Sequence, residues 1–341
     1  MSSKFAVLTF FLVAGALILG VASLNYFVDP MCFYRCSSVD IHKKNLNTFF
    51  HVGQIIVSHP ETENIMIGSS RGETTSPLWL EELLHMKSLN LSVGGTELQA
   101  KLAFLNMALK HTKVRQVIWQ ADFFEFIPEV IDVKMQNTEA LRSYIKNEFQ
   151  SDASQSKMSK LQDELKSLID HISFEASLKL LFSKKVKPLD QGSGSDLKYK
   201  DCETPEYKGD QDPDKLEKEI LNDYDRYRTV IFKNEFSEAY WRIFVEKLKS
   251  LDAQGIEVKI LVAPYNPLFM KRLALEYPKV YNEHFVWIKR LKSLSLSHVH
   301  ITDFFTGIPG DDQSAKYWND GVHFTCRGAM IMLRESLKNS P

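Results

Sequence analysis

Two short segments, one near each end of the chain, carry residues that could perform nucleophilic chemistry. Gly68-Ser69-Ser70-Arg71 follows an apolar run at residues 64–67, and Asp320-Gly321-Val322-His323 lies close to the C-terminus. A serine hydroxyl attacks well only when a base within hydrogen-bond reach takes its proton. His323 could be that base, and Asp320 could orient its imidazole through Nδ1. The pattern predicts a triad of Ser70, His323 and Asp320.

The same segments offer backbone donors for the anion that such chemistry creates. Ser70 would begin a helix after a strand, where free N–H groups and the helix dipole favour negative charge. Gly94 or Gly95 could bring a second N–H to the same point. One such donor lowers the barrier by roughly 3 kcal/mol. We therefore expect the oxyanion to lie between Ser70 and one of these glycines.

Each motif also has a simpler interpretation. The Gly-Ser-Ser-Arg segment could be a tight turn with a capping serine, or an anion site in which Arg71 holds a phosphate or carboxylate. Asp320 and His323 could be a surface ion pair. Asn266, which follows a strand and precedes Pro267, could line a pocket or simply form a turn. The order of the motifs along an alternating strand and helix pattern favours the triad.

The positioning elements are expected from short apolar runs that end at turns. Five such runs predict strands, at residues 64–67, 88–93, 114–119, 257–263 and 298–302. Helical patterns at 236–251, with Gly255 as a C-cap, and at 280–294 lie between the later strands. Alternating strands and helices predict an α/β fold with a mostly parallel sheet, whose carboxyl ends bind ligands.

A long segment separates the third and fourth predicted strands. We interpret residues about 130–230 as an insertion that is partly helical, at 158–181, and partly polar, at 187–225. Between residues 201 and 225 there are ten acids and three lysines. This polar part is expected to be a solvated loop or disordered.

The N-terminus predicts a membrane segment. Phe5–Leu24 is uncharged and long enough to cross a hydrocarbon core of about 30 Å. Lys4 on one side favours an inside N-terminus, hence a single-pass protein of the inner membrane with its body outside the cytoplasm. A cleaved signal ending near Val21-Ala22-Ser23 is the alternative. The expected organisation is an anchor at 1–24, a stalk and linker at 25–60 and a domain at 61–341.

Composition limits the partners. The formal net charge of −1 gives no basic surface for nucleic acid. Of the four cysteines, Cys32 and Cys36 are the favoured pair if the body lies in an oxidising compartment, with buried thiols as the alternative. A zinc site would need a second close pair of Cys or His residues, and the sequence predicts neither a metal nor a cofactor.

The motif series resembles the SGNH/GDSL hydrolase superfamily. The likeness rests on Ile-Gly-Ser-Ser-Arg, Asn90-Leu91-Ser92-Val93-Gly94-Gly95 and Asp320-x-x-His323. It is similar in particular to the membrane-anchored branch of bacterial cell envelopes, which includes polysaccharide O-acetyltransferases and teichoic-acid D-alanylation proteins. The resemblance implies an α/β/α sandwich of five parallel strands, of SGNH or flavodoxin-like type, with Ser70 as nucleophile and Gly94 or Gly95 as oxyanion glycine.

The third motif departs from this family. Where the family has an asparagine that donates to the oxyanion, this chain has Gln120-Ala121-Asp122. Asp122 as a carboxylate would repel an oxyanion, whereas Gln120 could donate if it points inward.

The sequence thus predicts an acyl-ester hydrolase or O-acyltransferase acting on a cell-envelope glycan through an acyl-enzyme. The alternative is an inactive envelope protein that binds a glycan or an assembly partner with the same pocket, including Arg71. A third hypothesis is a scaffold that works through the acidic insertion.

Overall fold

The computed structural model describes residues 3–28, 48–127, 168–169, 171–182, 208–310 and 315–338. The chain forms two compact units. One consists of Met1–Ser58 and Val133–Leu189, and the other of His59–Asp132 and Asp190–Pro341. All of the predicted site residues belong to the second unit.

The second unit is built on a five-stranded parallel sheet, as the sequence predicted. The strand order is β2-β1-β3-β4-β5. The strands are β1 (Asn64–Ile67), β2 (Ser88–Asn90), β3 (Gln116–Ala121), β4 (Glu257–Val262) and β5 (Val299–Asp303). The chain passes from β1 outward to β2 and then back across β1 to β3, so the order reverses at β1. In open α/β sheets this switch point is where ligands bind.

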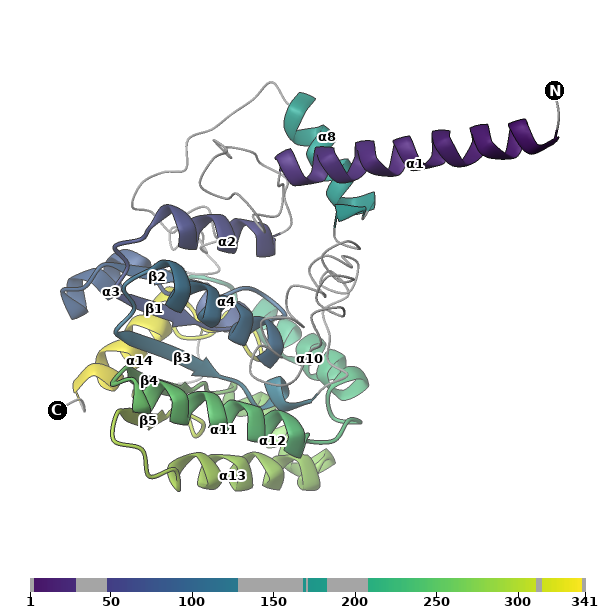
Figure 1. The fold of residues 1–341 in the computed structure, drawn as a ribbon. Helices are drawn as coiled ribbons and strands as arrows, with labels where there is room; N and C mark the ends of the chain where they lie inside the picture. The colour runs from purple at the N-terminus through teal and green to yellow at the C-terminus, as the bar shows by residue number, and fades with distance from the viewer. Residues whose placement is uncertain are drawn as a thin grey trace. The chain divides into compact units, whose positions relative to one another are not determined.

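Helices cover both faces of the sheet. In the second unit they are α3 (Pro77–Leu84), α4 (Leu98–His111), α10 (Pro213–Val230), α11 (Glu238–Ala253), α12 (Pro267–Glu276), α13 (Pro278–Lys292) and α14 (Cys326–Lys338), with 3-10 turns η2 (Ser70–Gly72) and η3 (Phe123–Phe126). Figure 1 shows α4 and α11 on one face and α14 on the other. The fold is therefore a three-layer α/β/α sandwich, which explains why β1 and β3 are buried along their whole length.

Helix bounds follow local capping signals. Ser237 caps α11 by accepting from Tyr240 N, and Gly255 has φ +69 just after the helix, as the predicted C-cap requires. The predicted helix at 280–294 is α13, which begins two residues earlier at Pro278. Proline is well tolerated at this first helical position.

The prediction of a loop or disorder at 187–225 is wrong for its last part. Residues 213–225 belong to helix α10, whereas residues 187–207 lie outside the described residues. Asp212 caps α10 and Pro213 occupies its first position. The excess of acidic residues predicts a loop, but acidic residues also favour the first turn of a helix, as does proline. The apolar residues Leu216, Ile220 and Tyr224, at helical spacing, are buried.

The first unit contains α1 (Ser3–Val28), α2 (Thr48–Ser58) and α8 (His171–Phe182). Helix α1 includes Lys4–Val28, a stretch of 25 residues long and apolar enough to cross a membrane. It continues four residues beyond the predicted anchor. Asn25, expected in the stalk, is buried and accepts from Ser177 Oγ of α8 at 2.9 Å. The predicted helix at 158–181 is described only in its last part, as α8.

The cysteines are described only in part. Cys326, the first residue of α14, is disulfide-bonded. Cys202 and the favoured pair of Cys32 and Cys36 lie outside the described residues.

An aromatic cluster fills the space between η3, α12 and α13 and encloses a histidine. His284 of α13 is 2% exposed, stacks on Phe123 with ring centroids 4.0 Å apart and stacks on Phe305 at 5.3 Å. Its Nδ1 lies 2.8 Å from the carbonyl oxygen of Val280. Burial lowers the pKa of His284 to about 4, so the ring is neutral in the folded protein at pH 7.

This histidine makes the fold acid-sensitive. Between pH 6.5 and about 4 the unfolded chain binds a proton that the folded chain does not, so stability falls as the pH drops through that window. At pH 5 the loss is about 2 kcal/mol. We expect His284→Phe to flatten the dependence of the urea midpoint on pH between 7 and 5. His85→Asn, at an exposed position, should follow the wild-type curve. Equal slopes for all three proteins would contradict the assignment.

Candidate active site

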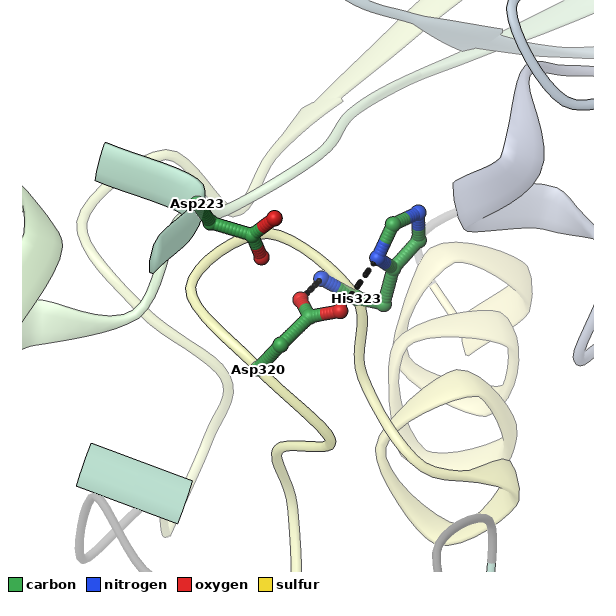
Figure 2. Close-up of side chains that lie close together, drawn as sticks. All are labelled: Asp223, Asp320 and His323. Carbon is green, nitrogen blue, oxygen red and sulfur yellow. Dashed lines mark hydrogen bonds and ion pairs between the residues drawn. The ribbon is translucent and has the colours of Figure 1, made fainter. Parts of the chain in front are cut away.

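The structure brings Ser70, His323 and Asp320 together in one hydrogen-bonded chain. His323 Nε2 lies 2.7 Å from Ser70 Oγ, and His323 Nδ1 lies 2.7 Å from Asp320 Oδ2. Figure 2 shows the imidazole turned toward the Asp320 carboxylate. The His323 side chain is 19% exposed, so the chain reaches solvent at its histidine. An ionised Asp320 fixes Nδ1–H as the donor, which leaves Nε2 free to accept the Ser70 proton.

The loop that carries Asp320 and His323 is held through its own backbone. The N–H of Asn319 donates to the carbonyl of His323 at 2.9 Å, which closes the loop at its base. Asp320 Oδ1 accepts from the N–H groups of Val322, at 2.9 Å, and His323, at 2.6 Å. The carboxylate therefore both orients the imidazole and fixes the loop. This double role explains the three-residue spacing that the sequence showed.

Gly321 is required in this loop by close packing. A Cβ on Gly321 would lie 2.9 Å from a ring carbon of Phe269 and 3.2 Å from Cβ of Asp223. The Gly321 carbonyl accepts from Asn266 N at 3.0 Å. Helices α10 and α12 thus pack closely against the loop at residues 319–323.

The two neighbouring serines have different partners. Ser69 Oγ donates to Asp122 Oδ2 at 2.7 Å and caps the short turn η2, whereas Ser70 Oγ faces His323. Ser69 is fully buried and Ser70 is half-buried. Both readings of the Gly-Ser-Ser-Arg segment therefore apply, each to one serine: Ser69 is the capping residue, and Ser70 lies at the predicted nucleophile position.

Arg71 joins three motifs that are distant in sequence. Its Nη1 donates to Asp122 Oδ1 at 2.6 Å, and its Nε donates to the carbonyl of Val322 at 3.0 Å. Its guanidinium carbon lies 4.5 Å from the ring centroid of Tyr265. Burial by itself would lower the pKa of Arg71, but Asp122, Tyr265 and Tyr227 together outweigh it, so the pKa is raised. Arg71 is 1% exposed and bound to protein groups, so it does not lie open to a phosphate or carboxylate ligand.

Asp122, predicted to stand in the third motif, is a buried partner of cations. Its two oxygens accept from Arg71 and Ser69, and Lys101 Nζ lies 3.8 Å away. Lys101 in turn donates to Glu125, which also accepts the Asp122 N–H at 2.7 Å. The expectation that this carboxylate would repel an oxyanion is therefore corrected, because buried cations neutralise it. As a carboxylate it also supplies no side-chain donor.

Gln120 lies beneath the turn that carries Ser70. A Cβ on Gly68 would come within 2.7 Å of both Gln120 Oε1 and Ser92 Oγ, and a Cβ on Gly72 would meet the same two atoms. Gln120 is 2% exposed. Its side chain thus supports the turn, and no described contact joins it to Ser70. The two glycines are needed so that the turn can approach this layer.

Gly94 lies beside Ser70, but its N–H is already engaged. A Cβ on Gly94 would be 3.4 Å from Cβ of Ser70, so the two residues are adjacent. The Gly94 N–H donates to Glu73 Oε1 at 2.7 Å. Gly95 has φ +76 and forms the turn. Among the described residues, no acceptor is bound to the Ser70 N–H. Of the two predicted oxyanion donors, the Ser70 N–H is thus open among the described residues and the Gly94 N–H is occupied by Glu73. Glu73 is not among the site residues that the sequence predicts.

Asn266 caps helix α12 rather than lining an open pocket. Its Oδ1 accepts from Leu268 N at 2.9 Å, and the residue is fully buried. Its Nδ2 has no partner among the described residues. The turn interpretation of Asn266 is therefore the correct one.

Asp223 of α10 is the site residue that the sequence analysis missed. Figure 2 shows it reaching toward Asp320 and His323. Its Oδ2 accepts from Gly321 N at 3.1 Å, and its Oδ1 accepts from Arg226 at 2.6 Å. Burial, followed by the negative charge of Asp320, raises the pKa of Asp223 to about 7. In contrast, the charge and hydrogen bonds of His323 hold the pKa of the buried Asp320 well below its usual value. Asp223 lies in a segment rich in acidic residues, and the sequence does not distinguish this buried carboxyl from its exposed neighbours.

One atom from each of Asp223, Asp320 and His323 lies within 4.8 Å of the others, a spacing that could hold a metal ion. These atoms already have partners, however. His323 Nδ1 is bound to Asp320, and the guanidinium of Arg226 lies on Asp223. We therefore interpret the cluster as hydrogen-bonded groups rather than a ligand set.

Comparisons with known proteins give a distant structural likeness. No protein-family model and no curated protein matches the sequence. Among solved structures, a candidate platelet activating factor from Streptococcus pneumonia is 12% identical with a TM-score of 0.37, over 86% of this chain and 90% of that one. A candidate acylhydrolase from Bacteroides fragilis is 10% identical with a TM-score of 0.39, over 87% of this chain and 98% of that one. A likeness at this level does not identify a reaction for this chain.

The buried pair of Arg71 and Asp122 should dominate the stability of the site. Arg71→Met leaves an unpaired buried carboxylate and should lower the free energy of unfolding by about 3–5 kcal/mol. Urea unfolding of the detergent-solubilised protein measures it. Arg115→Met, which breaks the more exposed pair with Glu63, should cost less than about 1 kcal/mol.

A double-mutant cycle then isolates the pair. Arg71→Met with Asp122→Asn should lose less than the sum of the two single losses, by at least about 1 kcal/mol. Additive losses would show that the two charges do not depend on each other.

Proposed function

We propose that this protein is a serine acyl-ester hydrolase or O-acyltransferase of the SGNH type. The observation that carries the proposal is the chain from Ser70 Oγ through the His323 imidazole to Asp320, with both steps at 2.7 Å. Each group has the geometry that its role requires, since nucleophile, base and orienting carboxylate are within hydrogen-bond reach in that order.

In the first half of the reaction, Ser70 Oγ attacks the carbonyl carbon of an ester while its proton moves to His323 Nε2. The imidazolium that forms is stabilised by the Asp320 carboxylate at Nδ1. The tetrahedral intermediate collapses when its C–O bond breaks. The leaving alkoxide takes the proton from Nε2, and the acyl group remains on Ser70.

In the second half, His323 removes a proton from the hydroxyl that attacks the acyl-enzyme. If water attacks, the acid is released and the protein is a hydrolase. If a sugar hydroxyl attacks, the acyl group passes to a glycan and the protein is a transferase. Ser70 recovers its proton from Nε2 in both cases, so the cycle is closed.

The oxyanion requires a rearrangement at Glu73. The Ser70 N–H, which has no acceptor among the residues that the structure describes, supplies one donor. The N–H of Gly94 supplies a second only after Glu73 Oε1 leaves it. A carboxylate and an oxyanion cannot share this donor, because two negative charges in contact repel each other. Glu73 therefore has to move aside as the substrate carbonyl enters.

The location that we propose is the outer side of the inner membrane, with α1 as a single-pass anchor. The 25-residue apolar stretch of α1 and the disulfide at Cys326 support it, because disulfides persist in oxidising compartments. An anchored acyl-transfer enzyme at that surface would act on an acylated cell-envelope glycan. The substrate part of the proposal rests on this location and on the resemblance of the motifs.

The second candidate function is that of an inactive binding protein of the envelope. It is favoured by Glu73, which occupies the Gly94 N–H, and by the absence of an amide donor at Asp122. The buried position of Arg71 does not favour a ligand site built on that residue. Covalent labelling separates the two functions.

The adjacent serines give a matched test. A fluorophosphonate probe should label the full-length protein in detergent at Ser70, and Ser70→Ala should reduce labelling and acetyl-ester hydrolysis by at least about 10³-fold. Ser69→Ala removes a hydroxyl bound to Asp122, not to His323, and should still be labelled. No labelling of a folded wild type would leave only the binding function.

Glu73 should slow acylation. Glu73→Gln removes the negative charge at the Gly94 N–H, so a substrate oxyanion displaces the side chain more easily. We expect the rate constant for fluorophosphonate labelling to rise by about tenfold, which corresponds to about 1.4 kcal/mol. Glu82→Gln, at an exposed position on α3, is the charge-matched control and should label like the wild type. A slower Glu73→Gln would mean that the carboxylate is needed to orient Gly94.

A further inference from the structure

A second carboxyl group, that of Asp223, is packed against the acid of the triad. Helix α10 brings it to the loop at residues 319–323, where it accepts the Gly321 N–H at 3.1 Å. One of its carboxylate oxygens also lies within 4.8 Å of an oxygen of Asp320. Asp223 is 8% exposed. The loop that carries the orienting carboxylate of the triad is thus itself held by another acid.

Two carboxyl groups this close repel each other when both are ionised, which favours the neutral form of one of them. Asp320 keeps its charge because His323 lies on its other side, so burial and the charge of Asp320 raise the pKa of Asp223 to about 7. An ionised Asp223 repels Asp320, whereas a neutral one does not. The pair therefore has two charge states near neutral pH.

Few charged groups lie near Asp223 to offset the negative charge that it gains on ionisation. Asp320 and His323 face it from the loop, and Arg226 faces it from its own helix. Arg226 is 59% exposed, so solvent screens its charge. The neighbouring groups that pack against Gly321 are Phe269 and the Ile220 backbone, which carry no charge.

We propose that Asp223 is a positioning residue of the Ser70–His323–Asp320 triad, which holds Asp320 and the Gly321 backbone in place and makes acylation respond to pH near neutrality. The inference rests on the proposed function of that triad. Its action is indirect, since Asp223 bonds to the Gly321 N–H and lies beside Asp320 rather than at the reacting atoms.

The test compares three variants of the full-length protein in detergent. Asp223→Ala removes the acceptor of the Gly321 N–H and should reduce the fluorophosphonate labelling rate by about 10- to 100-fold. Asp223→Asn keeps an oxygen for the Gly321 N–H and removes only the charge beside Asp320, so it should recover at least tenfold over Asp223→Ala. Asp225→Asn makes the same charge change at an exposed position on the same helix and should label like the wild type.

The pH dependence separates this role from a structural one. The pH profile of the wild-type labelling rate should contain an inflection near pH 7 in addition to the one that the His323 base imposes on both proteins. Asp223→Asn should lack this additional inflection, because the amide cannot ionise. Identical pH profiles for the two proteins would overturn the proposal. So would EDTA inactivation of the wild type that is reversed by a divalent metal, because Asp223 would then be a ligand.

A readout without turnover keeps this inference distinct from the proposed function. The imidazole NMR resonances of His323 should shift in two steps with pH in the wild type and in one step in Asp223→Asn. If the wild type is not labelled but these titrations differ, the enzyme function fails and the coupling through Asp320 stands. Identical titrations in the two proteins would refute the coupling whether or not the protein is an enzyme.

Discussion

The site depends on one buried cation. Arg71 is held by Asp122 at the end of β3 and holds the Val322 carbonyl of the C-terminal loop, so a single guanidinium connects all three segments that form the site. Ser70 precedes Arg71 and His323 follows Val322 in the chain. The separation of Ser70 and His323 is therefore set by the two residues next to them. A buried ion pair adds little net stability, but its loss leaves an unpaired charge, so this arrangement tolerates little variation.

This constraint also accounts for the unusual third motif. With Arg71 buried beside it, an asparagine in place of Asp122 would leave the guanidinium without a countercharge. The Asp122 carboxylate supplies this countercharge, but unlike an amide it has no N–H donor. Lys101 and Glu125 extend the network, so that the buried charges of these four residues balance. In the proposed function, an oxyanion would then be bound by the backbone N–H groups of Ser70 and Gly94. The Gly94 N–H is bound to Glu73.

Strands and the local pairing of Asp320 with His323 were predictable because they follow from short-range patterns. Apolar runs located all five strands to within a few residues, and a three-residue spacing placed carboxylate and imidazole on one loop. Roles that depend on packing were not predictable. Which serine faces His323, and that Asp122 pairs with Arg71, depend on how the ends of β1 and β3 meet. Asp223 was hidden because one buried acid cannot be distinguished from its exposed neighbours by composition.

Because Cys326 is disulfide-bonded, the structure of the site depends on the redox state of the compartment in which the chain folds. Cys326 opens α14 three residues after His323, so the bond secures the end of the segment that carries the histidine. In a reducing compartment this anchor would be absent, although every group of the triad would be present. Redox conditions during maturation, and not only sequence, would then help to decide how well the imidazole is aligned with Ser70.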